Sequence, residues 1–558
     1  MVWATAFTTV LLPLLGYLVR KTYHHRSTIN ALRKQGIAMP PGWSWVTGHL
    51  LILQKYVDQL PSNANVNLAM ADLAREFSDT EVFLMDFWPV YQPLLMVYDP
   101  DAAGQITAKY NLPKTDMHLH FMKPITGGPN LISMSDQEWK LWRSLFNPGF
   151  STAALTETVP HIVKSVEIFR EKLMEKAYAG ITCLDDLTTR LTMDVIMKIT
   201  LDADLNYQHS ENRLASALGH ITRWHSFWDP RILLHPLRPI IQKYYGRVMD
   251  NLIRKELDQR YFELRTGKFA RSDDNAGKMR TAKSVVTLAI EAYMTQNQHT
   301  DLLQKPQLEE HFARYATHQV RLFLFAGNDT TSSTIMYAYH LLSQHPNALQ
   351  IMRKEHDKVF GSNTDRASDL LAKQPALLNQ CKYTMAVIKE TLRLYPPAGT
   401  MRAGQPGISL NDRHGNKYPM DDIGAIILHP AVHRNPRVWP RPNEFLPERF
   451  LVDPDHELFP YAPAFRPFEQ GPRNCIGQTL VYNEIRVALI LTLRTFDISP
   501  AYDEWDTVKT QQASWFKRFK TRVFGQPVQT VHGDRAYQTE KAGTHPADGY
   551  PCRITLAK

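Results

Sequence analysis

The chain has 558 residues, of which 44% are hydrophobic and 21% charged, and its 64 Lys and Arg against 55 Asp and Glu give a net charge of +9. This composition excludes a mainly disordered chain, and the mean hydropathy of −0.33 excludes a protein with many membrane spans. Four cysteines are too few for a disulfide framework, and the modest basic excess favours a membrane surface or an acidic protein partner over nucleic acid.

The N-terminal residues predict a membrane anchor. Residues 2–19 carry no charge and would form a helix about 27 Å long, enough to cross the hydrocarbon core of a membrane. Basic residues follow from Arg20 to Arg26, which predicts that the rest of the chain faces the cytoplasm. A cleaved signal peptide, which would need leading basic residues, and a buried core helix are the alternatives. The predicted division is an anchor with its basic flank over 1–26, a proline-containing linker over 27–48 and one folded body over 49–558.

The pattern beyond the linker is mainly helical. The longest predicted helix covers residues 309–344 and would be about 50 Å long, enough to cross a whole domain. The other predicted elements are strands over 82–87 and 94–98, helices within 136–264 broken near Trp228 to Pro230, a surface loop over 267–282, a helix over 382–395, short strands within 398–430, an irregular proline-rich segment over 435–472 and a helix from Cys475 to about Arg494.

One motif carries the chemistry. Residues 468–477 read FEQGPRNCIG and fit the pattern F-x-x-G-x-R-x-C-x-G. Cys475 lies where a loop becomes a helix, so the free N–H groups of the helix start would stabilise a thiolate ligand. Gly471 and Gly477 would let the backbone approach a flat cofactor, and Arg473 can meet a carboxylate. The pattern predicts a thiolate metal ligand at Cys475 rather than a buried structural cysteine.

On this motif the chain resembles the cytochrome P-450 family of heme-thiolate monooxygenases, and the resemblance runs from the anchor to the C-terminus. It implies a mainly α fold with a small β subdomain, preceded by one N-terminal transmembrane helix, with residues 49–558 as the catalytic domain. It also implies heme b (iron protoporphyrin IX) as the cofactor, with Cys475 as the axial ligand of the iron.

A second segment resembles the family's oxygen-activation helix. Residues 326–331 read AGNDTT inside the long predicted helix. Gly327 would weaken the helix and Thr330 can bond a backbone carbonyl, so a distorted turn is expected there. An acid beside a hydroxyl forms a proton relay, and Asp329 and Thr330 are therefore predicted catalytic residues. The alternative is an exposed polar helix face.

A third segment resembles the family's ion network, which supports the fold. Glu390 and Arg393 fit E-x-x-R, and the spacing places both on one helix face. The same pattern occurs at Glu167 and Arg170, so position decides between the two. Glu390 precedes Arg449 in P-E-R-F, as in the family, and we expect these three residues to support the heme pocket.

Four further residues are predicted to bind the cofactor. Trp139 and Arg143 fit W-x-x-x-R, and the i, i+4 spacing aims both at one target. The resemblance makes that target a heme propionate, with Arg402 and Arg473 as further candidates. The alternatives are a helix-surface Arg143 beside a packed Trp139 and a plain surface cation at Arg402.

The resemblance implies a reaction and its partners. One oxygen atom of O2 would enter a lipophilic substrate, and electrons would come from NADPH through a separate membrane-bound NADPH–cytochrome reductase docking near Arg143. The layout of the closing segment resembles filamentous-fungal members of secondary metabolism, at the endoplasmic reticulum membrane. The alternatives are a reductase-independent heme-thiolate isomerase or dehydratase, and a non-enzymatic heme-binding module. Residues 505–527 form either a membrane-surface helix or a packed or disordered insertion.

Overall fold

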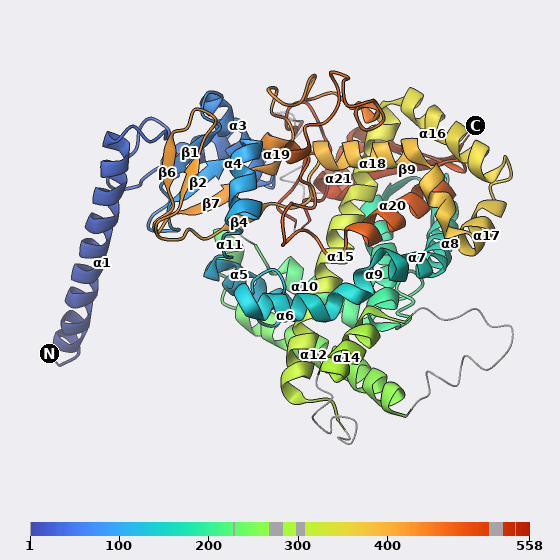
Figure 1. Ribbon diagram of the computed structural model, residues 1–558, viewed down its shortest axis with the longest axis horizontal. Helices are drawn as coiled ribbons and strands as arrows, with labels where there is room; N and C mark the ends of the chain where they lie inside the picture. The colour runs from blue at the N-terminus through green and yellow to red at the C-terminus, as the bar shows by residue number, and fades with distance from the viewer. Residues whose placement is uncertain are drawn as a thin grey trace.

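The structure is a computed structural model that describes residues 2–226, 229–266, 283–296, 307–512, 528–541 and 543–557, without the side chains of residues 2–11, 14 and 230. Helices form a large body, a smaller sheet subdomain lies at one end of it, and α1 stands out beside the subdomain (Figure 1). The predicted mainly α fold with a small β subdomain is confirmed.

The elements fall in the following order. The helices are α1 Val2–Lys34, α2 Leu50–Val57, α3 Val66–Ala74, α4 Pro100–Gly104, α5 Asp116–Thr126, α6 Asp136–Phe146, α7 Thr152–Glu157, α8 Val159–Lys176, α9 Leu184–Leu201, α10 Arg213–Arg223, α11 Pro230–Leu233, α12 Arg238–Arg265, α14 Val285–Gln296, α15 Glu310–Gln344, α16 Pro346–Phe360, α17 Arg366–Lys373, α18 Lys382–Leu394, α19 His429–Val432, α20 Gln478–Thr492 and α21 Tyr502–Gln512. The strands are β1 Val82–Met85, β2 Leu94–Val97, β3 Ile181–Cys183, β4 Thr400–Arg402, β5 Ser409–Asn411, β6 Lys417–Pro419, β7 Gly424–Ile427, β8 Phe496–Pro500 and β9 Pro551–Leu556.

The long helix α15 runs through the middle of the helical body and confirms the helix predicted over 309–344 (Figure 1). The Glu309 carboxylate caps it by accepting hydrogen bonds from the backbone N–H groups of His311 and Phe312. It ends at Gln344 because Pro346 lacks the N–H that an α-helix needs and instead begins α16. Helices α9, α18 and α20 pack against it, and the largest apolar core of the molecule lies among them.

The sheet subdomain has its own core. Its four strands run in the order β1-β2-β7-β4, with β2 and β7 parallel and the outer pairs antiparallel. Every residue of β1, β2 and β7 is buried, which is why these strands read as continuous apolar runs. The strands predicted near 82–87, 94–98 and within 398–430 are therefore confirmed.

A second sheet decides where the C-terminal segment lies. Strand β9 pairs with both β3 and β8, and Cys183 lies opposite Pro551. Because β3 leads directly into α9, this pairing brings the residues just before β9 next to the start of α9.

The first helix corrects the predicted division of the chain. Helix α1 continues to Lys34, so the first eight residues of the predicted linker over 27–48 are helical. Arg26 is fully buried and forms an ion pair with the buried Asp86, while Ile29 and Leu32 join the core of the sheet subdomain. The second half of α1 is thus part of the folded body rather than a linker.

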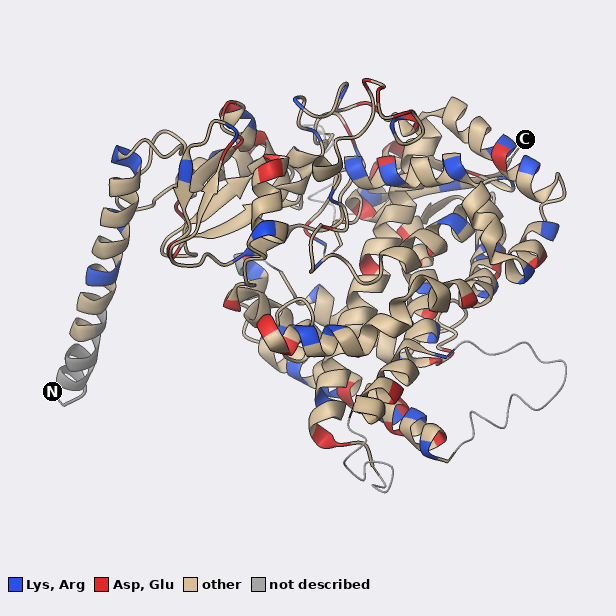
Figure 2. Cartoon of the chain, viewed as in Figure 1, with Lys and Arg blue, Asp and Glu red and all other residues tan. Residues whose placement is uncertain are grey.

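Among the residues and side chains that the structure describes, no helix is both long enough and apolar enough to cross a membrane. Much of the predicted span falls on residues 2–11 and 14, whose side chains lie outside the description. Leu12, Leu15, Leu18 and Val19 are exposed. Lys and Arg positions of α1 are marked from the middle of the helix to its C-terminal end (Figure 2).

Three other predicted features fall wholly or partly outside the described residues. These are the apolar break at Phe227 and Trp228, the surface loop over 267–282 and the part of the 505–527 insertion beyond Gln512. Helix α21 covers the beginning of that insertion.

Candidate active site

Cys475 lies in the loop that leads into α20. Its backbone N–H donates to the carbonyl of Phe468 at 2.9 Å, which closes the loop two residues before the N-cap Gly477. The N–H groups of Gly477 and Gln478 donate to the sulfur, as expected at a helix start. Burial nevertheless raises the pKa of the Cys475 thiol, and these hydrogen bonds and the charge of Arg143 only partly oppose it. A cation bound directly to the sulfur is what would make it a thiolate.

Space remains next to Cys475 inside the protein. The residue is accessible to water, although the surrounding protein desolvates its thiol. The next residues, from Ile476 to Thr479, also keep partial exposure at the start of an otherwise buried helix. The loop therefore borders a hollow that protein side chains leave open.

The glycines of the motif have different roles. A Cβ at Gly477 would meet only the Cys475 sulfur, at 3.9 Å, so this position leaves space next to the ligand. Gly471 has φ +83°, and a Cβ there would collide with the carbonyl of Thr107. The absence of a side chain at Gly471 thus allows a close approach to the backbone of Thr107 and Ala108, and its approach to a flat cofactor stays a prediction.

A group of buried cations lies in this region, and it outnumbers the nearby carboxylates of Glu469 and Asp136. Arg402, at the end of β4, is 1% exposed, and none of its three guanidinium nitrogens has a hydrogen-bond partner among the described residues. Nη1 of Arg473 is also buried without one. Burial, followed by the charge of Arg473, lowers the pKa of Arg402 to about 10. Unpaired buried charges are costly, so the arrangement calls for an anionic ligand.

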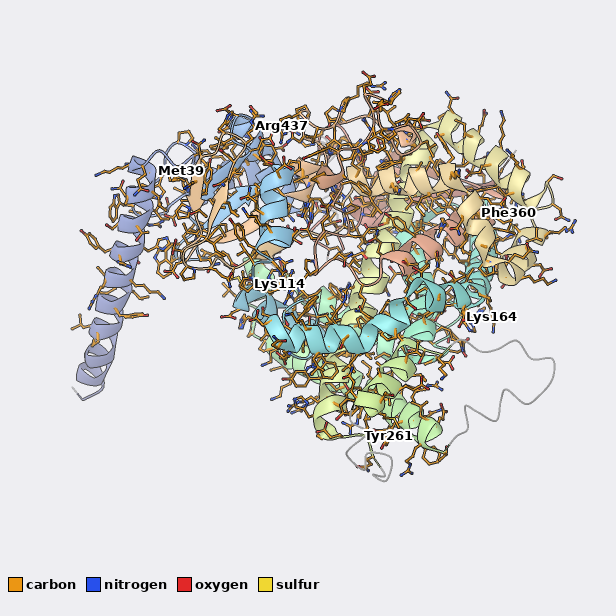
Figure 3. All side chains as sticks on the ribbon, in the orientation of Figure 1. Met39, Lys114, Lys164, Tyr261, Phe360 and Arg437 are labelled. Atoms are coloured by element: carbon orange, nitrogen blue, oxygen red, sulfur yellow. The ribbon has the colours of Figure 1, made fainter. Side chains whose placement is uncertain are left out.

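Two residues that the sequence analysis missed belong to this group. Burial and the charges of Arg402 and Arg473 lower the pKa of Lys114 well below its usual value. Burial and the charges of Lys114 and Arg402 lower the pKa of His118 to about 3. Lys114 lies between the sheet subdomain and α6 (Figure 3). Lys114 lies two residues before α5 and His118 in its first turn, and no motif in the sequence marks them.

Trp139 and Arg143 both lie next to this loop, but they do different things. The Arg473 guanidinium stacks 4.7 Å above the Trp139 ring, which connects α6 to the motif. Arg143 donates to the backbone carbonyl of Asn474 at 3.0 Å and to its side-chain oxygen at 3.3 Å. Both residues thus contact the Cys475 loop, which Arg143 holds at the residue before the ligand, and their pairing with a heme propionate stays a prediction.

The predicted acid and hydroxyl lie side by side on α15. The Thr330 hydroxyl donates to the Ala326 carbonyl at 2.8 Å, as expected, yet α15 stays helical through this turn and the predicted distortion is absent from it. A Cβ at Gly327 would come within 2.8 Å of Ile196, so this glycine serves the close packing of α9. Successive residues are about 100° apart on a helix, so Thr330 and Asp329 face different surroundings. Asp329 accepts a hydrogen bond from His545 at 3.0 Å.

The predicted ion network is present and completely buried. Arg393 donates two hydrogen bonds of 2.8 Å to the Glu390 carboxylate, and Nε of Arg449 lies 3.3 Å from the same carboxylate. Arg393 also donates to the carbonyls of His433 and Pro442. The network ties α18 to the irregular segment that leads to the Cys475 loop.

The residues present fit heme b. Cys475 offers one sulfur next to interior space, and the orphaned guanidinium of Arg402, with Arg473, Lys114 and His118 near it, suits the two carboxylates that the cofactor carries.

Comparisons with known proteins agree with this geometry. The family model described as "Cytochrome P450" matches residues 39–518. "Cytochrome P450 monooxygenase polC" of Polytolypa hystricis is 36% identical over 96% of this chain and 93% of its own length, and "Cytochrome P450 monooxygenase acrF" of Aspergillus aculeatus is 32% identical over 88% and 98%. A solved structure, "Crystal structure of cytochrome P450DA heme domain", aligns with TM-score 0.67 over 94% of this chain and 97% of that chain at 18% identity, a likeness of fold.

Proposed function

The chain belongs to the cytochrome P-450 family and is a heme b monooxygenase whose electrons come from a reductase, and we propose that it inserts one oxygen atom of O2 into a lipophilic secondary-metabolite intermediate. The other oxygen atom leaves as water. The fungal origin of the two most similar relatives quoted above supports the substrate class.

The observation that carries this proposal is the Cys475 sulfur, which lies next to interior space beside helix-terminal N–H groups. Bound heme supplies the reductive activation of dioxygen, which a thiolate ligand favours. The protein's share is to hold the ligand loop still, through Arg143 on Asn474 and through the network of Glu390 and Arg393.

The remaining predicted residues receive roles on the same basis. Arg402 and Arg473, with Lys114 and His118, would pair with the propionates, and Trp139 would hold Arg473 in place by stacking. Thr330 would hold a water at the oxygen-binding face through its hydroxyl, and Asp329 would supply that water with protons.

The location of the enzyme is part of the proposal. We expect the first half of α1 to cross the endoplasmic reticulum membrane once, with the body on the cytoplasmic side, near an NADPH–cytochrome reductase. The exposed apolar side chains from Leu12 to Val19 and the basic residues that follow them support this placement. The reductase would dock near Arg143, where the Cys475 loop lies closest to α6.

The ligand assignment is tested by Cys475→Ser. The variant removes the thiolate, so the reduced enzyme under carbon monoxide should lose the red-shifted Soret band that the family shows. Cys552→Ser is the matched control, because a hydroxyl can keep the hydrogen bond that the buried Cys552 thiol donates to the Thr182 carbonyl. Retention of the band in Cys475→Ser would refute the assignment.

An assay with added reductase separates the proposed reaction from its alternatives. The monooxygenase consumes NADPH and O2 and forms product, an isomerase or dehydratase forms product without NADPH, and a binding module forms none. Comparing metabolites of the parent strain with those of a deletion strain would identify the substrate as the intermediate that accumulates.

A further inference from the structure

A buried histidine connects two carboxylates behind the oxygen-activation segment. His545 is 1% exposed; its Nδ1 lies 2.6 Å from Asp185 and its Nε2 lies 3.0 Å from Asp329. Asp185 is in the first turn of α9, Asp329 is on α15 and His545 precedes β9. With both ring nitrogens facing carboxylates, the ring is an imidazolium that donates a hydrogen bond on each side.

The surrounding contacts fix the position of this ring. Ser333, on the next turn of α15, donates to the Thr544 carbonyl at 3.3 Å, and Gln538 donates to the Thr544 hydroxyl at 2.7 Å. A Cβ at Gly543 would collide with the Asp329 carboxylate, so the loop passes directly over it. The Lys541 ammonium forms an ion pair with Asp185. The loop is therefore held against α15 from several directions.

Two grooves give water access to the two carboxylates that His545 connects. One, of about 610 Å³ between α9, α10 and α15, is lined by Asp329, Glu540 and Lys541. The other, of about 620 Å³, is lined by Asp185, Asp186 and Lys541. His545 itself is covered, whereas both of its carboxylate partners border these grooves.

We propose that His545 is the proton donor that recharges Asp329, and that Asp185 is the positioning residue that keeps the imidazole charged and oriented. The inference rests on the proposed function, because it assigns the source of the protons that Thr330 passes on. One carboxylate oxygen of Asp329 accepts a hydrogen bond from His545. The other oxygen is buried without a hydrogen-bond partner among the described residues.

The proton balance is simple. The bond between Nε2 and its proton breaks and an O–H bond forms on Asp329, so an ion pair becomes two neutral groups and no electrons move. Asp329 then gives this proton to the chain that ends at Thr330. The Asp329 carboxylate then takes a proton from water in the groove that it lines and passes it to Nε2 of the covered imidazole, and Asp185 stays ionised throughout.

The charges around the ring agree with this division of roles. Burial by itself would lower the pKa of His545, but Asp185 and Asp329 outweigh it and raise the pKa to about 9. Burial would raise the pKa of Asp185, but His545 and Lys541 hold it well below its usual range. The transfer to Asp329 is therefore uphill at rest and proceeds when the reaction consumes protons, which keeps the proton stored until then.

The test compares His545→Gln and Asp185→Asn with Thr330→Val and a control, His340→Gln. His340, on α15, is likewise a buried histidine paired with a carboxylate, that of Asp534. It has no assigned part in the relay. In the holoenzyme with reductase, His545→Gln should keep the reduced carbon-monoxide spectrum but lower product per NADPH by on the order of tenfold, with peroxide released instead. His340→Gln should keep the wild-type ratio.

The pH dependence separates proton donation from simple fastening of the loop. Product per NADPH in the wild type should fall above about pH 9, where the imidazolium is lost. Asp185→Asn removes one of the two charges that raise the pKa of His545. The fall in product per NADPH, the alkaline limb of the pH profile, should therefore move to lower pH. Isotope-edited infrared titration of ¹⁵N-histidine-labelled holoenzyme reads the same midpoint without turnover, the His545 band being the one missing in His545→Gln.

The outcomes are distinguishable. If Thr330→Val releases peroxide while both relay variants keep the wild-type ratio and pH limb, the relay is wrong and the proposed function stands. If the infrared midpoint moves in Asp185→Asn but the limb of turnover does not, His545 is charged but does not donate. If the wild type consumes no NADPH or O2 with reductase, the proposed function fails and the relay fails with it.

Discussion

At the scale of single residues, Glu390 is the anion on which two buried guanidinium groups depend. Arg393 and Arg449 both contact its carboxylate, and all three side chains are completely buried. Glu390→Gln would leave two buried charges without a counter-charge, so we expect a loss of about 3–5 kcal/mol in the free energy of unfolding. Urea unfolding of the holoenzyme, followed by the Soret band and by circular dichroism, measures it.

The chain supplies a matched control at Glu167. Glu167 and Arg170 have the same i, i+3 spacing, but their ion pair of 3.5 Å is partly exposed, and Arg170 also pairs with Asp365. Glu167→Gln should therefore change the free energy of unfolding by about 1 kcal/mol or less. Equal effects of the two variants would contradict the structural role of the buried network.

At the scale of elements, Asp86 fastens α1 to the sheet subdomain. Its carboxylate accepts hydrogen bonds from His25 at 2.9 Å and Trp43 at 2.8 Å, and it pairs with Arg26. Burial would raise the pKa of Asp86, but these hydrogen bonds and the charge of Arg26 outweigh it and lower the pKa to about 2. The folded pKa lies below the unfolded value of about 3.9, so the stability from Asp86 is present above about pH 4 and is lost as the pH falls toward 2.

The dependence of stability on the pKa of Asp86 gives a prediction for Asp86→Asn. Nearly two pKa units correspond to about 2 kcal/mol, so the variant should be less stable than the wild type by about that amount or more at pH 6. About half of the difference should remain at pH 3, and most of it should disappear near pH 2. Urea unfolding at these pH values checks it, and a difference that did not depend on pH would contradict the ionic contribution.

At the scale of the whole molecule, the structure divides α1 into two parts with different tasks. Removing residues 1–19 leaves Arg26, Ile29 and Leu32 in place, so we expect the body to keep its stability and its heme while moving partly into the soluble fraction. Removing residues 1–26 also takes away the counter-charge of the buried Asp86 and should destabilise the body in addition.

Membrane flotation and urea unfolding of both truncated proteins measure the two effects separately. If the protein lacking residues 1–19 floated with membranes to the same extent as the wild type, the proposed anchor would be contradicted. Equal free energies of unfolding for the two truncated proteins would contradict the structural role of Arg26.

The elements themselves were largely predictable from sequence. The helix over 309–344, the strands near 82 and 94 and the helix after Cys475 follow from local apolar patterns and from Pro346, and the structure contains them. The linker over 27–48 was predicted from its prolines, and its first eight residues are instead helical. Arg26 was taken for part of the membrane flank, whereas it meets Asp86, which lies sixty positions further along the chain.

The sequence by itself was enough to predict the ligand cysteine and the acid and hydroxyl pair, because each is a local motif, and to predict the ion network of Glu390, Arg393 and Arg449 once the family resemblance had decided between Glu390 and Glu167. Only the tertiary structure decided that Arg402 lies without a counter-ion near Lys114 and His118, and that His545 bridges Asp185 and Asp329. Those groupings join residues hundreds of positions apart, and they depend on the pairing of β3 with β9 and on how α5 and β4 meet. Long-range pairing of this kind leaves no periodic pattern in a single sequence. Which charged residues lie next to one another is therefore known only from the folded structure.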